Sequence, residues 1–222
     1  MPKKSRQFVL EPQAIEYLEK YGVPYPAHGF ARSAKEAAEI ADMIGCPVVL
    51  KVVSPDVPHK TDVGGVSLGL NDPDEVQAGY KSLIARVTKT APGVDVEGIL
   101  VCRQAEEGLE VIVGALDDDV FGPTVMFGLG GIFTEVLKDV SFRIVPLKCI
   151  DAEEMIQEIS GFPVLSGIRG QSRRDINGLV DLIVSVSNLV GNEPDIKELD
   201  LNPVRIYEEC VLTLDVRLAR WT

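Results

Sequence analysis

The order of helix and strand patterns along the chain limits its fold more than any other feature. The first half interleaves helical and strand-like stretches, whereas the second half contains mostly strand-like stretches that follow one another. Strands that succeed each other in this way are typical of antiparallel pairs. The pattern therefore predicts an α+β fold with helices on one side of its sheets, and it argues against a doubly wound parallel sheet.

Apolar spacing and capping residues locate the expected elements. Ser33 is a candidate N-cap of the second helix, Glu36 completes a capping box, and Gly45 ends the helix. The stretches 96–104 and 109–118 are interpreted as a strand pair, and 196–207 and 210–219 as a two-stranded hairpin. Helices are expected at 11–21, 34–44, 74–90, 151–159 and 175–190, and further strands at 47–54, 64–71, 122–131 and 142–148.

Composition excludes several classes of protein. The 222 residues carry a formal net charge of −12, which is the wrong sign for general nucleic-acid binding. No apolar run is long enough to span a membrane. The four cysteines are widely scattered, which fits unpaired thiols in a reducing cytoplasm better than a disulfide framework or a zinc site. The sequence also lacks GxxxxGK[ST], so a nucleotide would have to be held without a P-loop.

A lone lysine, Lys51, lies in the middle of the apolar stretch "PVVLKVVS". Burial of an unpaired ammonium group is costly, so the side chain needs a negatively charged partner. The partner is either a carboxylate of the chain itself or an anionic ligand such as phosphate. The sequence alone leaves these two alternatives about even.

The stretch "VPHKTDVGGV" contains His59, one of only two histidines in the chain. A neutral imidazole can attack phosphorus and form a phosphoramidate, and Lys51 and Lys60 would favour that form and attract the phosphoryl group. Gly64 and Gly65 allow backbone N–H groups to approach phosphate oxygens closely. The alternative is an ordinary solvated loop histidine.

The C-terminal stretches "ELDLNP" and "LTLD" place oxygen ligands on neighbouring strands. Asp200 and Asn202 are two residues apart and so share one face of a strand, and Asp215 can lie opposite them. Carboxylate and amide oxygens are ligands that Mg²⁺ accepts. The alternative is the polar face of a sheet, but Asn and Asp are poor strand formers, which favours a metal site.

Four long segments resemble the ATP-grasp fold, specifically the short β subunit of ADP-forming acyl-CoA (acetyl-CoA) synthetases. The segments are "GCPVVLKVVSPDVPHKTDVGGV", "GLEVIVGALDDDVFGPTVMFGLGGIFTEVLKDVSFRIVPL", "IRGQSRRDINGLVDLI" and "IKELDLNPV", which run through nearly the whole chain. The resemblance implies two α+β subdomains that clamp a nucleotide. The expected parts are an N-terminal helix at 1–21 that packs on the second subdomain, a first subdomain at 22–100 and a second at 101–222.

The resemblance also implies roles for single residues, with ATP or ADP and Mg²⁺ as cofactors. His59 matches the phosphorylated histidine, and Lys51, Lys60, Gly64 and Gly65 are expected near phosphates. The backbone of Val101, Cys102, Arg103 and Gln104 is expected at the adenine edge, although relatives commonly have "VQEM" there. Glu110 is expected near the ribose or phosphates, Arg143 and Glu135 near the γ-phosphate, and Asn202, Asp215 and Asp200 around the metal.

The reaction implied by the resemblance is acyl-CoA + ADP + phosphate ⇌ carboxylate + CoA + ATP, catalysed by an acid-thiol ligase. A separate CoA-binding α subunit would complete an α2β2 heterotetramer and reach the acyl-CoA or carboxylate. Two other functions stay open on the sequence alone. One is a stand-alone ATP-grasp carboxylate ligase without phosphohistidine, and the other is a non-catalytic nucleotide-sensing subunit.

Overall fold

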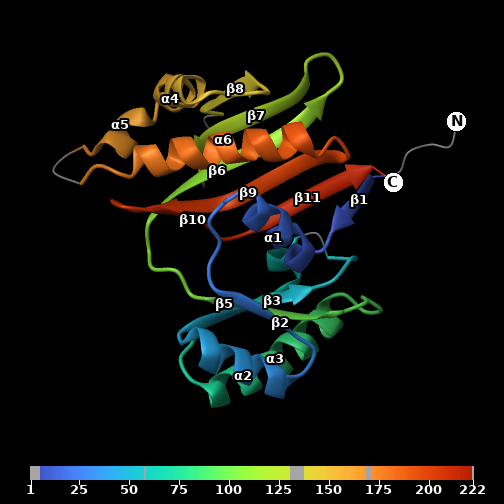
Figure 1. Cartoon of the computed structure of the whole chain (residues 1–222). Coiled ribbons are helices and arrows are strands. Elements are labelled where there is room, and N and C mark those ends of the chain that lie inside the picture. Colours follow the sequence, from blue (N-terminus) through green and yellow to red (C-terminus); the bar gives the residue numbers. More distant parts are fainter. Residues whose placement is uncertain (1–5, 58, 131–137, 169–171, 222) are drawn as a thin grey trace, which may run out of the picture. The chain divides into compact units, whose positions relative to one another are not determined.

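The computed structural model describes residues 6–57, 59–130, 138–168 and 172–221. Contacts between residues divide the chain into two compact units. The seven-stranded unit comprises residues 1–9, 13–25 and 107–222, and the four-stranded unit comprises residues 10–12 and 26–106. Figure 1 shows the helices and strands of both units. The subdomain boundaries expected at residues 21 and 100 remain a prediction.

The four-stranded unit is an antiparallel sheet with its helices on one face. Strands follow the order β2-β5-β3-β4, and α2 and α3 pack on the sheet (Figure 1). The strands are β2 (His28–Ala31), β3 (Val48–Val53), β4 (Val66–Leu70) and β5 (Gly98–Arg103), the helices are α2 (Ala34–Ile44) and α3 (Pro73–Thr90), and the short 3-10 helix η1 spans Lys60–Val63.

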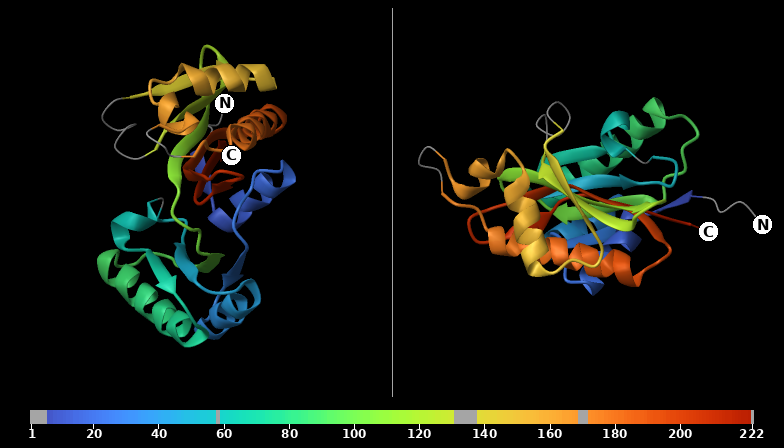
Figure 2. Two further views of the ribbon diagram at one scale, coloured as in Figure 1. Left: turned by 90° about the vertical axis from the view of Figure 1, so that its left-hand side faces the viewer. Right: turned by 90° about the horizontal axis from the view of Figure 1, so that it is seen from above.

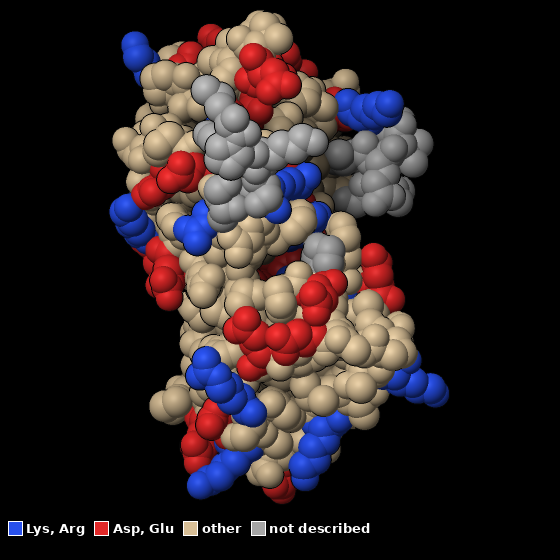
Figure 3. Space-filling model, turned by 90° about the vertical axis from the view of Figure 1, so that its right-hand side faces the viewer, with Lys and Arg blue, Asp and Glu red and all other residues tan. Residues whose placement is uncertain are grey.

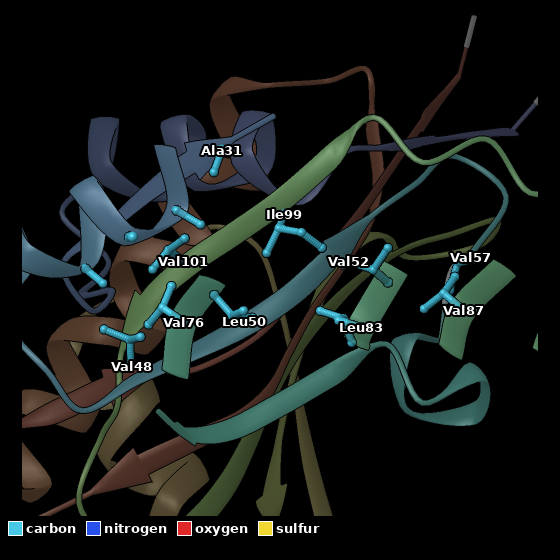
Figure 4. Packing of buried hydrophobic residues seen from close by; sticks show 13 residues of the cluster. Ala31, Val48, Leu50, Val52, Val57, Val76, Leu83, Val87, Ile99 and Val101 are labelled. Carbon is cyan, nitrogen blue, oxygen red and sulfur yellow. The ribbon is translucent and has the colours of Figure 1, made fainter. Parts of the chain in front are cut away.

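The core of this unit fills the space between the sheet and its two helices. Figure 4 shows side chains of β3, β5 and α3 that point into this space, among them Leu50, Val101 and Leu83. These three side chains are fully buried. Alternate residues of β3, from Val48 through Leu50 to Val52, face the helices, which places Lys51 on the opposite face of the sheet.

Local signals define α2 as the sequence predicts. The Ser33 hydroxyl accepts a hydrogen bond of 3.2 Å from the backbone N–H of Glu36. The Glu36 carboxylate accepts from the backbone N–H of Arg32 instead of that of Ser33, so the expected capping box forms only in part. Gly45, with a φ of 83°, follows the last helical residue because its left-handed backbone costs a glycine little.

The seven-stranded unit is also antiparallel, with the strand order β1-β11-β9-β6-β7-β8 and β10 paired to β9. Helices α4 and α6 pack on one face of this sheet (Figure 2). The strands are β1 (Arg6–Val9), β6 (Leu109–Asp118), β7 (Gly122–Leu129), β8 (Val140–Ile144), β9 (Ile196–Ile206), β10 (Val211–Thr213) and β11 (Val216–Trp221). The helices are α1 (Glu11–Lys20), whose first two residues belong to the four-stranded unit, α4 (Cys149–Glu158), α5 (Phe162–Ser166) and α6 (Ile176–Asn192).

The predicted fold class is confirmed, because every strand pair in the described ranges is antiparallel and the helices lie on one side of each sheet. The expected pairing of 96–104 with 109–118 is wrong. Strand β5 pairs with β2 and β3 in one sheet, and β6 pairs with β7 and β9 in the other. Strands β1 and β2 and helix α5 are elements that the sequence patterns did not reveal.

Candidate functional site

Lys51 lies in the middle of β3, where all six residues are buried. The strand is hydrogen-bonded on both sides, to β5 and to β4, so its backbone is held rigidly. The Lys51 ammonium donates a hydrogen bond of 2.7 Å to the carboxylate of Glu11. The side chain therefore has the carboxylate partner that one of the two sequence-based alternatives required.

Lys60 shares the same carboxylate. Its ammonium lies 3.1 Å from the second oxygen of Glu11, and the Lys60 and Glu11 side chains are only 10% and 3% exposed. One buried carboxylate thus lies between two ammonium groups, and the three side chains together carry one net positive charge. The two lysines expected near phosphates therefore meet in the four-stranded unit, and an anion that approached them would be attracted.

His59 precedes the first residue of η1 and is exposed. Its backbone carbonyl accepts a hydrogen bond of 3.3 Å from the N–H of Asp62, which begins the turn. An exposed imidazole can be reached by a phosphoryl donor, which a ring packed in the core could not. The position of His59 beside Lys60 places it one residue from the cluster that Glu11 forms with the two lysines.

Gly64 and Gly65 close the turn after η1. Gly64 has a φ of 65°, and its N–H donates to the Thr61 carbonyl at 3.0 Å, while the Gly65 N–H donates to the Lys60 carbonyl at 2.6 Å. A Cβ at Gly65 would lie 2.5 Å from a methyl group of Val52. The glycines thus allow the turn to pass close to β3, and in this conformation both N–H groups bond within the turn rather than facing outward.

Arg86 on α3 secures the other side of this turn, which the sequence did not reveal. Its guanidinium donates to the carbonyls of Gly64 and Val66, at 2.6 and 3.0 Å, and to the Ser67 hydroxyl at 3.0 Å. The contacts bridge about twenty residues of sequence, so no local pattern could have indicated them. Arg86 holds the end of the turn and the start of β4 in one position.

The residues expected at the adenine edge lie at the end of β5. Val101 and Cys102 are buried in the centre of the sheet, where β2 and β3 flank them. The Arg103 guanidinium donates to the Ile44 carbonyl at 3.2 Å, and the Gln104 side chain accepts from the N–H of Gly69 at 2.6 Å. Both long side chains are therefore tied to the four-stranded unit, which leaves the local backbone position well defined.

Glu110 and Arg205 form a pair in the seven-stranded unit. They lie opposite each other on β6 and β9, and the guanidinium donates twice to one carboxylate oxygen, at 3.1 and 3.0 Å. Directly opposed charges stabilise neighbouring strands. Glu110 is thus held in place by a residue that the sequence did not single out.

The predicted metal ligands lie at an interruption of the C-terminal sheet. Strand β9 pairs with both β10 and β11, and Asp215 lies in the break between the latter two. The N–H of Asn202 donates to the Asp215 carbonyl at 3.3 Å, and the Leu214 N–H donates to the Pro203 carbonyl at 2.9 Å. The expected antiparallel pairing of 196–207 with 210–219 is therefore confirmed, but the second strand is interrupted opposite Pro203, which has no N–H with which to continue the ladder.

The oxygen ligands present suit a hard cation that takes only a few of its ligands from the protein. Asn202 and Asp215 contribute an amide and a carboxylate at adjacent backbone positions, which suits Mg²⁺ with other oxygens completing its shell. Asp200 lies on β9 opposite Arg217, and their charged groups are 4.0 Å apart, so its charge is partly balanced. Within the described ranges, no group of three or more His, Cys, Asp or Glu side chains could hold a metal by itself.

The structure does not group Arg143 with these ligands. Arg143 on β8 pairs with Glu158 of α4 at 2.7 Å, on the helix-covered face of the sheet. The strand registers place Asp200 on the opposite face, because its neighbours Leu199 and Leu201 are the residues buried beneath the helices. The expectation that Arg143 points toward the phosphates has no support in this conformation. Glu135 lies outside the described residues.

The surface carries charges of both signs despite the acidic composition. Both Asp and Glu side chains and Lys and Arg side chains are present on the face shown in Figure 3, where several acidic side chains lie together near its middle. Nowhere in the described part of the chain is a helix both long enough and apolar enough to cross a bilayer.

Comparison with known proteins identifies the family. Residues 1–219 match the ATP-grasp domain family. The chain is 43% identical, over 97% of its length and 93% of the relative's, to the acetate–CoA ligase [ADP-forming] I subunit beta of Pyrococcus furiosus. It is also 43% identical to the acetate–CoA ligase [ADP-forming] I of Archaeoglobus fulgidus, but it spans only 30% of that longer protein. A relative named as a subunit and a longer relative with additional sequence together imply a separate partner subunit.

Similarity to solved structures supports the same family assignment. Acetyl-coenzyme A synthetase 1 of Candidatus Korarchaeum cryptofilum, in complex with coenzyme A, Ca-AMPCP and HgCl+, has a TM-score of 0.94 and 42% identity, over 96% of this chain and 93% of that one. The same protein with a phosphorylated phosphohistidine segment has a TM-score of 0.90 and 40% identity, over 97% and 94% of the two chains. The resemblance inferred from the sequence is confirmed: the chain belongs to the ATP-grasp family and, within it, to the β subunits of ADP-forming acetate–CoA ligases.

Proposed function

We propose that this chain binds ADP and ATP and relays a phosphoryl group through His59 in the reaction acyl-CoA + ADP + phosphate ⇌ carboxylate + CoA + ATP. The observation that carries the proposal is the position of His59, exposed and adjacent to Lys60, whose ammonium shares the buried Glu11 carboxylate with Lys51. The phosphohistidine segment named for the Korarchaeum synthetase supports the same role.

In the direction of ATP formation, the phosphorylated imidazole gives its phosphoryl group to ADP. A terminal β-phosphate oxygen of ADP attacks phosphorus, the new P–O bond forms, and the N–P bond breaks with its electron pair returning to the ring nitrogen. The reverse step phosphorylates His59 from ATP and releases ADP. Lys51 and Lys60 neutralise charge on the group that moves, which is where most of the rate acceleration in phosphoryl transfer arises.

Asn202 and Asp215 would hold Mg²⁺, and Asp200 would assist from its position beside Arg217. The bound ion would neutralise phosphate charge and orient the nucleotide. The backbone at the end of β5 is proposed to meet the adenine edge, and Glu110 the ribose or phosphates. These assignments follow the family resemblance and the donor chemistry described above.

The partner is proposed to be a CoA-binding α subunit that supplies the acyl-phosphate chemistry, in an α2β2 assembly. In the Archaeoglobus relative, the matching region is part of a much longer chain, which supports the need for additional sequence. Four free cysteines, with no two joined, support a reducing cytoplasm as the location.

The two histidines of the chain provide the test of the relay. The full chain, with and without its α partner, is incubated with Mg²⁺ and γ-³²P-ATP, and label is measured after acid and after base. We expect acid-labile, base-stable label that disappears in His59→Ala and persists in the matched control His28→Ala. Label that remains in His59→Ala would reject His59 as the carrier. Activity of His59→Ala in the complete reaction would favour a ligase without phosphohistidine.

A further inference from the structure

The relay described above gives no role to Glu11, the most deeply buried charged side chain near His59. Its side chain is 3% exposed, and its two carboxylate oxygens lie 2.7 Å from the Lys51 ammonium and 3.1 Å from the Lys60 ammonium. A carboxylate with this degree of burial is costly to maintain unless both of its oxygens are paired. The cluster therefore holds all three side chains in one arrangement.

We propose that Glu11 is a positioning residue that holds the His59 segment, residues 59–65, in place through Lys60. The proposal rests on the proposed role of His59 as the phosphoryl carrier. Glu11 itself does not touch the group that moves. It fixes the ammonium of Lys60, and the backbone of Lys60 carries His59 as its immediate neighbour.

The exposure pattern of the segment supports this role. His59, Thr61 and Asp62 are all exposed, whereas the Lys60 side chain is only 10% exposed. Lys60 is thus the point at which the first half of the segment is attached to the four-stranded unit. The second half is attached separately, by the Gly65 carbonyl, which accepts a hydrogen bond of 2.8 Å from the Val52 N–H, and by Arg86.

The Glu11 carboxylate also offsets the repulsion between the ammonium groups of Lys51 and Lys60. Lys51 belongs to a rigid central strand, whereas Lys60 belongs to a short turn. Without the Glu11 carboxylate between them, the two ammonium groups would repel each other, which would favour movement of Lys60 away from Lys51. Glu11 therefore keeps Lys60, the cation beside His59, close to Lys51, the cation proposed to bind phosphate. This arrangement holds the imidazole in position to exchange a phosphoryl group with the nucleotide.

Amide hydrogen exchange of the full chain measures this attachment directly. The N–H groups of Asp62, Gly64 and Gly65 donate within the segment and report its opening. We expect Glu11→Gln and Lys60→Gln each to increase exchange of residues 59–65 by about tenfold, because each removes the buried Glu11–Lys60 ion pair. The matched control is Glu39→Gln, which removes the carboxylate of the exposed Lys35–Glu39 pair and should change nothing in the segment.

The double variant separates positioning from general stability. If Glu11 acts through Lys60, Glu11→Gln combined with Lys60→Gln increases exchange no more than the larger of the two single changes, because both remove the same contact. The proposal would be overturned if the exchange increases of the two single variants multiplied in the double variant. It would also be overturned if exchange of residues 59–65 were unchanged in Glu11→Gln, or if exchange rose equally throughout β5.

Single-turnover labelling then connects the attachment to the relay. Glu11→Gln should lower the rate constant for labelling of His59 from Mg-ATP by about tenfold, while prolonged incubation still reaches the label content of the unmodified chain. An unchanged rate constant would contradict the proposal. The two ideas fail differently: label that survives His59→Ala removes the relay but leaves the exchange result intact, whereas normal exchange in Glu11→Gln removes the positioning role but leaves the relay intact.

Discussion

The ammonium of Lys51 and the carboxylate of Glu11 lie 2.7 Å apart although 40 residues separate them in the sequence. The pair is buried, with side-chain exposures of 10% and 3%. The lysine that is proposed to bind phosphate therefore also pairs with a buried carboxylate of the same four-stranded unit, and a change at this position affects stability and nucleotide binding together.

Lys51→Met should lower the free energy of unfolding by about 2 kcal/mol, less than the full loss of a buried pair because Lys60 still contacts Glu11. The variant should also bind ADP at least about tenfold more weakly. Urea denaturation and calorimetric titration measure the two effects. Lys35→Met, at an exposed position on α2, is the matched control, and an unchanged ADP affinity in Lys51→Met would contradict the assignment.

Asp215→Asn should raise the metal concentration required for half-maximal labelling of His59 by at least about tenfold, because it removes the charged oxygen from the proposed Mg²⁺ site. Titration with Mg²⁺, repeated with Mn²⁺, measures the change. Asp42→Asn, an exposed aspartate on α2, provides the control. Equal metal requirements for the unmodified chain and Asp215→Asn would exclude Asp215 as a ligand.

Leu50→Ala should destabilise the chain by about 2–5 kcal/mol, because a fully buried side chain in the core shown in Figure 4 is replaced by a cavity. Leu68 on the neighbouring strand is 69% exposed, so Leu68→Ala should change stability by no more than about 0.5 kcal/mol. Chemical denaturation compares the two variants. Equal losses would show that this sheet face does not form the core.

The four cysteines should differ in their reaction with iodoacetamide. Cys149 and Cys210 are exposed and should be alkylated first, whereas Cys102 is buried. Burial, followed by the negative charge of Asp72, raises the pKa of the Cys46 thiol above 9.0, so less reactive thiolate is present at neutral pH. Mass spectrometry should show Cys46 reacting slowly at neutral pH and faster as the pH is raised into the alkaline range. Early alkylation of Cys46 at neutral pH would contradict its placement.

The contact of Lys20 and Tyr21 with Glu193 should make stability depend on pH at both ends of the range. The hydrogen bond from Lys20 lowers the pKa of Glu193 below 4.5, and the same bond raises the pKa of Lys20 above 10.5. The contribution of Glu193 to stability is present above pH 4.5 and is lost as the pH falls through the lowered pKa. The contribution of Lys20 to stability is present below pH 10.5 and is lost as the pH rises through the raised pKa.

Glu193→Gln should therefore lower the melting temperature by only about 1–3 °C near pH 7, because the pair is largely solvated. Thermal unfolding from acid to alkaline pH measures the effect. The difference between Glu193→Gln and the unmodified chain should shrink at both extremes, and a difference that is constant across the range would show that the contact does not depend on charge.

Local structure was predictable wherever neighbouring residues decide it. Ser33 and Gly45 bound α2 because the cap hydroxyl and the left-handed glycine act within one turn of the helix. The apolar run around Lys51 forms β3, and the "ELDLNP" stretch forms the middle of β9. The exposed position of His59 also follows from its polar, glycine-rich surroundings. These features depend on steric and hydrogen-bonding preferences that operate over a few residues.

Partners far apart in the sequence required the tertiary structure. The sequence indicated that Lys51 needs an anionic partner, but only the folded chain selects Glu11. Similarly, β5 and β6 have equally strong strand patterns, yet they join different sheets, and Arg143 faces the helices rather than Asp200. The sequence by itself determined most of the elements, though not β1, β2 and α5, together with the fold class and the chemistry of the candidate residues. Only the tertiary structure decided which charges meet, because pairing energies depend on distance and burial, which chain order does not encode locally.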